Sequence, residues 1–332
     1  MSSVGRALPD VPVRPLLAPW ARVAAEGGRI SVRIDDAAIV LEGPAADRLL
    51  PALLPLLDGE RTADELSACF GAAIAPAVRN ALGVLALQGL LVEGPSVATA
   101  PPGAAFLAGF GAAAGLGAGR PAAVVDALAA RRVAVVGEGA VAALVAALVA
   151  AAGPRVERLP LAGVAGDDDE ACGFDLVVAV PGGAGRGLLG EVDDALRARG
   201  RPWLAVPGLD GSRALVGPIV VPGASCCYAC FTRRRADASG FGDAWAALDR
   251  APGPELAGAP AALVAAVAAQ IALCAMADGI GVAVPAGVVW AVDLVPEIAV
   301  TRHVVHRVPR CPACSPAVAL PGLLPWRGEA AA

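Results

Sequence analysis

The clearest chemical signal in the sequence is a set of four cysteines in two C-x-x-C pairs. Cys227 and Cys230 form the first pair, and Cys311 and Cys314 form the second pair far downstream. Each pair presents two sulfurs to one ion, and four thiolates in two such pairs are the usual tetrahedral ligand set of Zn²⁺. Because all four ligands are cysteines, no coordination position is open for water. The spacing therefore predicts a structural rather than a catalytic zinc site.

The remaining cysteines are weaker candidates. A redox disulfide is the alternative for a C-x-x-C sequence, but a redox pair is expected singly at a helix N-terminus. Cys226 cannot replace Cys227, since the residue three positions after it is Ala229. We expect the other three cysteines to be small buried hydrophobic side chains; they are Cys69, Cys172 and Cys274.

A glycine-containing segment from Gly137 to Ala142, with the sequence GEGAVA, is the second candidate site. It lies where a dinucleotide or ATP loop would join a first strand to a helix, but it has only two of the three glycines of G-x-G-x-x-G. Glu138 would place a negative charge beside a bound phosphate, which is the wrong sign for an anion site at a helix N-terminus. The segment therefore favours a structural turn, with nucleotide binding as the alternative.

Other polar groups do not assemble into a catalytic set. His303 and His306 are the only histidines, and their odd separation on a predicted strand places them on opposite faces. The triplet Arg233–Arg235 is typical of a solvated helix start, with phosphate or carboxylate binding as the alternative. The acidic run Asp167–Glu170 is typical of a solvated loop. We therefore predict no catalytic residue.

The composition excludes several classes of protein. All 26 basic residues are arginine, so the chain has neither a P-loop lysine nor a Schiff-base lysine. A net charge of −5 without a basic face argues against nucleic acid as a partner. The apolar runs Gly139–Gly153 and Ala259–Ala277, the latter interrupted by Gln270, fall short of the roughly 20 residues of a membrane span. With no signal peptide at the N-terminus, we expect a cytoplasmic protein without membrane contact.

These candidate residues must be positioned by folded elements, and shifts in composition divide the chain into three parts. We expect an N-terminal domain over residues 1–95, a Pro/Ala/Gly-rich linker over 96–121 and a second domain over 122–325. In the first domain, the runs RISVRID and AAIVLEG predict a β-hairpin. Helices are expected over Pro44–Leu57, after Thr62 and over Pro76–Gln88, and LLVEG predicts a last strand. This order is the outline of a small winged-helix domain.

The second domain shows strands that alternate with helices. RRVAVVGEG, RVERLPL, FDLVVAV and PWLAVP are apolar strand patterns, and helices are expected over 140–152 and 187–199. Fully apolar strands in this alternation predict a parallel sheet covered on both faces, in a Rossmann-like α/β domain. Beyond it we expect antiparallel strands in RALVGPIVVPG, a long helix over 259–278, and strands over 287–294 and 298–308.

Two segments together resemble a known superfamily. GPIVVPGASCCYACFTRRRAD and VHRVPRCPAC, downstream of GEGAVA, resemble the E1-like (ThiF-like) proteins, whose adenylating domain carries a split four-cysteine zinc site. The N-terminal block resembles a PqqD-like winged-helix module, the recognition element of RiPP biosynthesis (ribosomally synthesised, post-translationally modified peptides). The combination is similar to the E1-like leader-peptide-binding proteins of azol(in)e and thiopeptide biosynthesis, which are partners of YcaO-type cyclodehydratases. The resemblance also implies a homodimer.

Departures from the active E1 pattern indicate a scaffold. The Asn-Leu-x-Arg-Gln segment of adenylating relatives cannot exist here, because the only asparagine is Asn80. Pro181 stands after the third strand where an aspartate is expected, and Glu157 lies inside the second strand rather than at its tip. With no Mg²⁺ ligand and no phosphate-binding cation in the expected places, we expect ATP not to bind.

The resemblance implies that a precursor's leader peptide adds as a strand beside the second strand of the hairpin, which is β-augmentation. The residues implied in peptide binding are Ala38, Ile39, Val40, Leu41 and Glu42 on the edge strand, and Val78, Arg79, Leu82 and Leu85 along a groove.

Three alternatives stay open. Val78, Leu82 and Leu85 can instead face the core of their own domain. The whole chain can be an active adenylating enzyme that acts on a peptide or carrier-protein C-terminus. A winged-helix protein that binds DNA is disfavoured, because the N-terminal block carries more acidic than basic residues.

Overall fold

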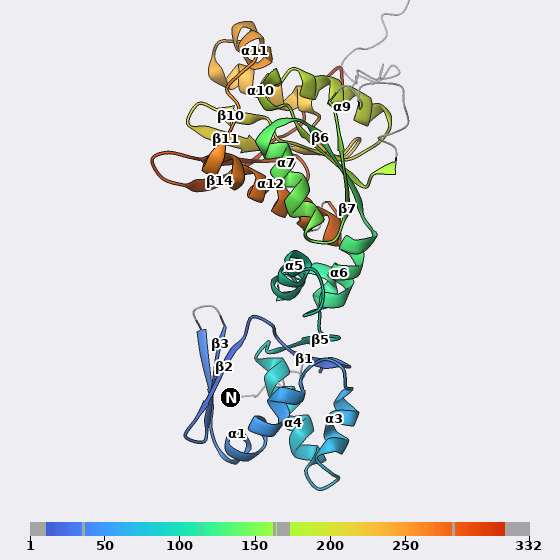
Figure 1. Cartoon of the computed structure of the whole chain (residues 1–332), viewed down its shortest axis with the longest axis vertical. Coiled ribbons are helices and arrows are strands. Elements are labelled where there is room, and N and C mark those ends of the chain that lie inside the picture. Colours follow the sequence, from blue (N-terminus) through green and yellow to red (C-terminus); the bar gives the residue numbers. More distant parts are fainter. Residues whose placement is uncertain are drawn as a thin grey trace, which may run out of the picture. The chain divides into compact units, whose positions relative to one another are not determined.

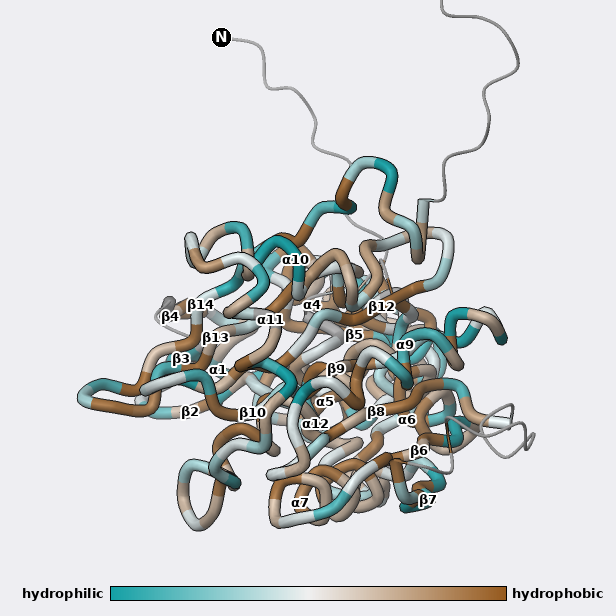
Figure 2. Tube along the Cα trace, turned by 90° about the horizontal axis from the view of Figure 1, so that it is seen from above, coloured by the Kyte–Doolittle hydropathy of each residue, from teal (hydrophilic) through white to brown (hydrophobic). Residues whose placement is uncertain are grey.

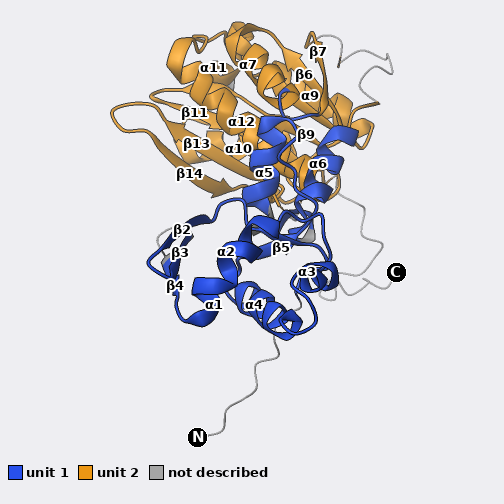
Figure 3. Ribbon diagram, turned by 60° about the horizontal axis from the view of Figure 1, so that its bottom comes forward, with its two compact units in different colours: residues 1–130, 151–153 blue, residues 131–150, 154–332 orange. Residues whose placement is uncertain are grey.

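The computed structural model of the chain describes residues 11–34, 37–113, 115–161, 164, 173–280 and 283–315 (Figure 1). The chain divides into two compact units, which are described separately. Unit 1 comprises Met1–Ala130 with Ala151–Gly153, and unit 2 comprises Arg131–Ala150 with Pro154–Ala332 (Figure 3). Both units mix helices with strands, so the chain belongs to the mixed α/β class.

Unit 1 contains a three-stranded antiparallel sheet in the order β2-β3-β4. The predicted hairpin is confirmed as β3 and β4, in which Ser31 pairs with Val40 and Val32 with Ile39. The sequence analysis missed β2, which pairs with β3, and β1, which pairs with the predicted last strand β5. The strands are β1 (Pro15–Leu17), β2 (Arg22–Glu26), β3 (Arg29–Ile34), β4 (Ala37–Leu41) and β5 (Leu91–Glu93).

The segment predicted as one helix over Pro44–Leu57 is broken into three pieces. Prolines cause the breaks: Pro51 and Pro55 lack the N–H that a continuing helix needs, and each lies in the first turn of a new piece. The pieces are α1 (Pro44–Arg48), α2 (Leu50–Leu53) and a 3-10 turn (Leu54–Leu56).

The next two helices of unit 1 begin and end close to where the sequence indicates. The predicted capping box of α3 (Ala63–Cys69) is present: Thr62 Oγ1 accepts from Glu65 N at 3.2 Å, and Glu65 Oε2 accepts from Thr62 N at 2.7 Å. Helix α4 (Ala75–Leu87) follows. The core between these helices and the sheet is built from aliphatic side chains; its fully buried members include Ile30, Val32, Leu53, Leu66, Val78, Leu82, Leu85 and Leu90.

Residues 96–121 contain more regular structure than a linker requires. Helix α5 (Pro102–Ala113) and a 3-10 turn (Leu116–Gly119) precede α6 (Pro121–Ala130), and all three belong to unit 1.

Unit 2 is built around a five-stranded sheet in the order β12-β9-β8-β6-β7. The four strands from β6 to β9 are parallel, as predicted, and β12 is antiparallel to β9. The strand order reverses between β6 and β8, because β7 and β8 lie on opposite sides of β6. The strands are β6 (Arg132–Gly137), β7 (Arg155–Leu159), β8 (Leu176–Val180), β9 (Trp203–Ala205) and β12 (Ile219–Val220).

Helices cover both faces of this sheet. On one face, α9 (Leu188–Ala198) and α10 (Tyr228–Ser239) bury Ala134, Val177 and other alternate strand residues. The intervening strand residues point to the other face, where α7 (Gly139–Ala150) and α12 (Gly258–Asp278) pack together and against β8. In the hydropathy colouring, hydrophobic residues mark β8 and hydrophilic positions appear on α9 (Figure 2).

Helix α12 corrects the expectation that the apolar runs are too short for a membrane span, because Gln270 does not interrupt it. With 21 residues, it is long and apolar enough to cross a membrane by length and composition alone. Within its most apolar window 56% is buried inside the chain, and a core helix meets the same criterion.

A second sheet of unit 2 is antiparallel, in the order β10-β11-β13-β14. The predicted strands in RALVGPIVVPG, over 287–294 and over 298–308 correspond to β11, β12, β13 and β14, whereas helix α11 (Asp243–Arg250) was not predicted. The strands of this sheet are β10 (Gly208–Asp210), β11 (Arg213–Val216), β13 (Val288–Asp293) and β14 (Ala299–Val304).

Candidate metal centre and neighbouring sites

The two C-x-x-C pairs come together in unit 2. The sulfurs of Cys227, Cys230, Cys311 and Cys314 all lie within 4.8 Å of one another. Sγ of Cys227 is 3.7 Å from that of Cys230 and 3.7 Å from that of Cys311, and the sulfurs of Cys230 and Cys314 are 3.5 Å apart. Four sulfurs about 2.3 Å from one tetrahedral Zn²⁺ are about 3.8 Å apart. The four cysteines therefore could hold a metal ion, and their spacing fits zinc.

A helix start and two arginine side chains position the pairs. Cys227 is the N-cap of α10 and Cys230 lies in its first turn. Arg234 on the same helix donates from Nε to His306 O at 2.6 Å and from Nη2 to Arg307 O at 2.8 Å. Arg307 in turn donates from Nε to Ser225 O at 2.8 Å. These contacts hold the segment before the second pair against the first pair.

Burial makes the first pair a poor set of free thiols. It raises the pKa of the Cys227 and Cys230 thiols above the ordinary value. Burial acts the same way on Cys311, but backbone N–H groups of Cys314 and Ala313 outweigh it and lower the pKa of Cys311 to about 7. A divalent cation favours the thiolate form of all its ligands, so metal binding offsets the cost of burying them.

None of the other described cysteines belongs to this cluster. Cys226 is buried beside the ligands, and burial raises its pKa to about 12, which suits a thiol that stays protonated. Cys69 is exposed, so the expectation that it is buried is wrong: it is the last residue of α3, where the helix ends at the surface. Cys274 is half-buried, and Cys172 lies outside the described residues.

A buried carboxylate lies next to the cysteine cluster. Asp193 on α9 is 1% exposed, and its Oδ1 accepts from Trp203 Nε1 and its Oδ2 from Tyr228 N, each at 3.2 Å. The second bond satisfies one of the free N–H groups at the start of α10. Burial raises the pKa of Asp193 to about 6, although both hydrogen bonds act to lower it. Sequence analysis could not single out Asp193, because its partners Trp203 and Tyr228 are not marked by any pattern near it in the chain.

The GEGAVA segment forms the turn between β6 and α7, and it lines a cavity of about 490 Å³ at the carboxyl ends of the parallel strands. In open parallel sheets, ligands bind at this edge where the strand order reverses, here between β6 and β8. The cavity carries three carboxylates, Glu138, Glu191 and Glu255, and no arginine lines it among the described residues. A phosphate group in this cavity would meet charge of its own sign.

Glu255 occupies the place where a helix N-terminus would hold an anion. Its Oε1 accepts from Ala140 N at 3.3 Å in the first turn of α7. Gly139, at φ +87°, allows this approach, because a Cβ there would lie only 1.7 Å from Glu255 Oε1. Gly253 also donates its N–H to Gly183 O at 3.3 Å in the loop after β8. The segment before α12 is thus tied to the edge of the sheet, and sequence analysis missed it because the partners lie 115 and 70 residues apart.

The structure places Pro181 and Glu157, the two residues that differ from the adenylating pattern, where the sequence predicted them. Pro181 follows β8 directly and lines the cavity, so no carboxylate stands there to hold Mg²⁺. Glu157 lies within β7 rather than at its end.

The residues expected to bind a peptide as an added strand lie on an edge of the sheet in unit 1. Strand β4 pairs only with β3 among the described residues, so its other side is unpaired. Ile39 and Leu41 are half-buried against the core, whereas Ala38 is exposed and Val40 is 51% exposed. Glu42, after the strand, pairs with Arg29 at 2.6 Å on the surface.

The residues expected to line the peptide groove are not brought to the surface together. Val78, Leu82 and Leu85 are at most 1% exposed and belong to the core of unit 1. This agrees with the alternative that the three residues face the core of their own domain, because positions 78, 82 and 85 lie on the side of α4 that packs inward. Of the four, only Arg79 is exposed.

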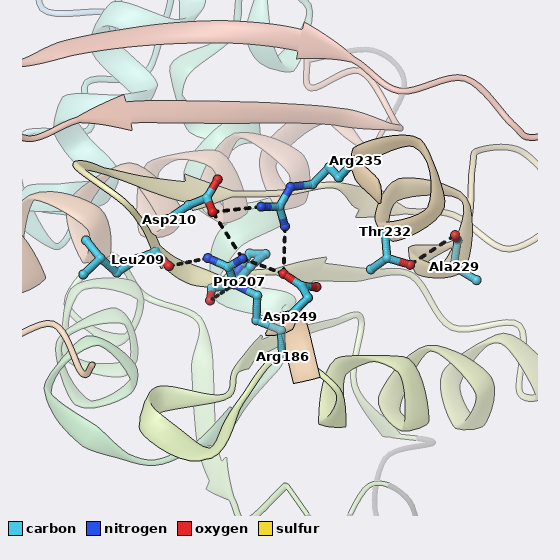
Figure 4. A network of polar contacts seen from close by, with 8 residues as sticks. All are labelled: Arg186, Pro207, Leu209, Asp210, Ala229, Thr232, Arg235 and Asp249. Atoms are coloured by element: carbon cyan, nitrogen blue, oxygen red, sulfur yellow. Dashed lines mark hydrogen bonds and ion pairs between the residues drawn. The ribbon is translucent and has the colours of Figure 1, made fainter. Parts of the chain in front are cut away.

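The arginine triplet is largely engaged in structure. Arg234 holds the second cysteine pair, and Arg235 joins a network with Arg186, Asp210 and Asp249 (Figure 4). In this network Asp249 Oδ1 accepts from Arg186 Nη1 at 2.7 Å and from Arg235 Nη1 at 3.1 Å. The sequence did not indicate the network, since its members come from four separate segments.

The remaining polar candidates are placed as follows. His303 lies on β14 with Nε2 3.1 Å from Thr301 Oγ1, and neither histidine belongs to the cysteine cluster. The acidic run 167–170 lies outside the described residues.

No protein-family model matches the sequence, and no curated protein is similar enough to match it. Solved structures share its fold. A heterocyclase in complex with substrate and cofactor matches with a TM-score of 0.63 and 18% identity, over 91% of this chain and 39% of its own. The heterocyclase TruD matches with a TM-score of 0.61 and 22% identity, over 92% of this chain and 43% of its own. The chain therefore spans about two fifths of the length of these heterocyclases.

A second group of similar structures is close to this chain in length. MccB of E. coli, solved with ATP, matches with a TM-score of 0.58 and 14% identity, over 90% of this chain and 99% of MccB. MccB, described as a microcin C7 biosynthetic enzyme, is also solved in complex with N-formylated MccA. At these identities the likeness concerns the fold.

Proposed function

We propose that this chain is a non-catalytic protein of RiPP biosynthesis that binds the leader peptide of a precursor. It presents the precursor to a YcaO-type, ATP-dependent cyclodehydratase that forms thiazoline or oxazoline rings. The unpaired edge of β4 carries this proposal. Similarity in fold to two heterocyclase chains, of which this chain spans about two fifths, supports a role beside a heterocyclase.

The β4 edge has the features that strand addition requires. Among the described residues, no strand pairs with its outer backbone N–H and C=O groups, so an extended peptide can pair with them and gain affinity without regard to sequence. Val40 projects from the strand to the surface, while Ile39 and Leu41 alternate with it toward the core. With Val78, Leu82 and Leu85 buried, side-chain selection rests on Val40 and on exposed groups such as Arg79.

The domain identities are part of the proposal. Residues 1–95 form a PqqD-like winged-helix recognition domain, 96–121 connect it, and 122–325 form an E1-like, Rossmann-type domain. The four cysteines hold one structural Zn²⁺ that joins the second pair to α10. The protein acts in the cytoplasm as a homodimer.

The cavity at the carboxyl ends of the parallel strands supports a role without ATP chemistry. Adenylation requires cations around the phosphates, but this cavity is lined by three carboxylates, and Glu255 already accepts the N–H that a phosphate would use. We therefore assign no catalytic residue to the chain.

An E1-like adenylating enzyme is the second candidate. One observation favours it: MccB, solved with ATP, matches over 99% of its own length. Incubation of the pure protein with ATP and precursor peptide separates the two functions. Pyrophosphate release that depends on the leader, without any partner enzyme, would establish the adenylating function and refute the scaffold.

Binding of a fluorescein-labelled leader peptide, encoded beside this protein and followed by fluorescence polarisation, tests the proposal directly. Val40→Glu places a charge on the β4 edge and should weaken binding at least tenfold. Val23→Glu is the matched control, since Val23 is a 38% exposed valine on β2, the other edge of the same sheet. If no such peptide binds, or if both variants lose affinity equally, the β4 edge is not the recognition site.

A further inference from the structure

Strand β14 is the last strand of the antiparallel sheet in unit 2 and, among the described residues, pairs only with β13 (Figure 1). All six of its residues are exposed. Val300 and Val304 are 50% and 58% exposed, and Ile298, just before the strand, is 69% exposed. Because side chains alternate along a strand, these three residues lie on one face and form an apolar stripe that only Arg302 interrupts.

One hydrogen bond shows which main-chain groups of β14 face outward. Val305 N donates to Gly287 O at 2.8 Å, and this contact continues the register of β14 with β13. Main-chain groups alternate between the two sides of an antiparallel strand, so those of Val300, Arg302 and Val304 point away from β13. No strand in the described part of the chain pairs with these outer N–H and C=O groups.

The other edge strands of unit 2 are protected against pairing. Strand β7 carries three charged side chains among its five residues, which are Arg155, Glu157 and Arg158, and β10 and β12 are only three and two residues long. Strand β14 has one permanently charged side chain, that of Arg302, and no proline. Short or charged edges resist pairing, whereas a longer apolar edge is a template for another strand. Strand β14 is therefore the edge of this unit that is best suited to bind one.

We propose that β14 pairs with β14 of a second copy of this chain, antiparallel across a two-fold axis at Thr301. The homodimer belongs to the proposed function, and this inference rests on it and assigns its interface. In this register Ile298 lies opposite the partner's Val304, and Val300 lies opposite the partner's Arg302. No like charges face each other, and the two copies of Thr301 form a hydroxyl pair of the kind that stabilises sheets.

The neighbouring registers are less favourable. A two-fold axis at Arg302 would place this cation opposite its own copy. An axis at Val300 would bring Pro296, which has no N–H, into the ladder opposite the partner's Val304. The axis at Thr301 avoids both costs and pairs every residue from 298 to 304.

A second copy suits this edge better than a peptide from another chain. A single added peptide leaves its own outer edge unpaired, so the exposed edge only moves outward by one strand. Two-fold pairing uses both β14 edges at once and forms one eight-stranded sheet, which ends in the three-residue β10 of each copy. One strand pair is small beside the roughly 1,200 Å² of total surface that stable complexes bury, so we expect a dissociation constant in the micromolar range.

Disulfide cross-linking tests the two-fold axis. Thr301→Cys is made in a background in which Cys69, Cys172 and Cys274 are serine, and it is incubated with oxidised glutathione at about 100 μM protein, above the expected dissociation constant. Opposite residues whose main-chain groups point away from each other have Cα atoms about 4.5 Å apart, within the roughly 4.4–6.8 Å that a disulfide accepts. We expect Thr301→Cys to form a covalent dimer.

Ala299→Cys and His303→Cys are the matched controls in the same background. Both lie on the same face as Thr301, but each is displaced from its own copy in the partner by four residues, about 14 Å along the strands. Neither variant should cross-link alone. A mixture of the two should cross-link, because Ala299 lies opposite the partner's His303 in this register.

Opposite charges at one exposed position test the same register without cysteine chemistry. Val300→Arg faces the partner's Arg302 twice in the dimer and should weaken dimerisation about fivefold in sedimentation equilibrium. Val300→Glu places a carboxylate opposite the partner's Arg302 and should dimerise at least as tightly as the wild type. Thermal unfolding checks that both variants are folded.

The proposal is overturned if the wild type is a monomer at about 100 μM, if Thr301→Cys cross-links no more than Ala299→Cys, or if both Val300 variants weaken the dimer equally. Hydrogen exchange at the amides of Val300, Arg302 and Val304 that slows only when precursor is added to a monomer would assign this edge to a peptide instead. Leader binding at β4 is measured on another sheet with a labelled peptide, so a failure here leaves that part of the proposed function untouched.

Discussion

Replacement of a single sulfur provides the sharpest test of the metal centre. Cys227→Ser removes one of four ligands whose sulfurs lie 3.5 to 3.7 Å from their nearest neighbours. Cys226→Ser is the matched control, because Cys226 is the adjacent residue, is equally buried and does not belong to the cluster. Both variants replace a buried thiol by a hydroxyl, so they differ only in the loss of a ligand.

The expected magnitudes differ widely. A structural zinc site contributes roughly 10–16 kcal/mol of apparent binding free energy in small peptides, which is comparable with the roughly 5–15 kcal/mol that separates a folded domain from its unfolded state. In this chain the metal would also hold the segment after β14. Among the described residues, that segment is otherwise joined to α10 by the hydrogen bonds of Arg234 and by the Val308 N–H to Cys230 Sγ bond, and Arg307 joins it to the loop before α10. Cys227→Ser should therefore unfold much of unit 2, whereas burying one hydroxyl in Cys226→Ser should lower the free energy of unfolding by about 1–3 kcal/mol.

Metal analysis and thermal unfolding measure the two effects. The wild type and Cys226→Ser should contain about one zinc per chain, and Cys227→Ser should contain almost none. Circular dichroism should show a cooperative transition for the first two proteins and a much lower or absent transition for the third. A wild-type protein without metal, or a Cys227→Ser variant that keeps its zinc and melts with Cys226→Ser, would falsify the zinc assignment.

Three further predictions concern stability, each measured by urea unfolding. Burial raises the pKa of Asp193 from 3.8 to about 6. Between these pH values the folded state holds a proton that the unfolded state has lost, so the free energy of unfolding falls as the pH rises through 6. Relative to Asp193→Asn, which does not titrate, the wild type should gain about 1 kcal/mol when the pH falls from 7 to 5, and a constant difference would contradict the raised pKa. Asp249→Ala leaves Arg186 and Arg235 with only Asp210 as an ion-pair partner and should cost up to about 3–5 kcal/mol. Asp194→Ala is the control: its pair with Arg197 is 70% exposed at the aspartate, so the change should cost less than about 1 kcal/mol. Thr62→Ala removes one half of the capping box of α3 and should cost about 1 kcal/mol, and a neutral result would show that the cap is not needed.

Local patterns in the sequence were sufficient for elements whose stability is local. The apolar runs of β6 and β8, the capping box of α3 and the helical spacing of α4 are each marked within a few residues, and the structure has all of these elements. Two prolines were the exception, since the leucines around Pro51 and Pro55 suggested one helix where the missing N–H groups break it. The four cysteines were equally predictable, because C-x-x-C spacing is itself the signal.

Features that depend on distant partners could not be predicted. Strand β1 is only three residues long and exists because β5, more than 70 residues later, pairs with it. Every residue of β2 is exposed, so the strand lacks the alternation of apolar and polar residues that would mark it in the sequence. Val78, Leu82 and Leu85 have the spacing of a helix face, but spacing alone cannot tell whether that face meets the core or a groove. Glu255 and Asp193 are single carboxylates whose roles arise only where the chain folds back on them.

The cavity at the carboxyl ends of the parallel strands can be judged from both the sequence and the structure. A chain without lysine can still bind phosphate through arginine and backbone N–H groups, so the missing lysines do not decide the matter alone. The structure adds that no arginine lines this cavity among the described residues, and that Glu255 accepts a backbone N–H at the start of α7. A nucleotide would have to displace that carboxylate and remain close to Glu138 and Glu191. No arginine of the described residues lines this cavity, three carboxylates do, and one of them accepts a backbone N–H of the first turn of α7. That combination is the electrostatic support for the proposed scaffold over the adenylating alternative.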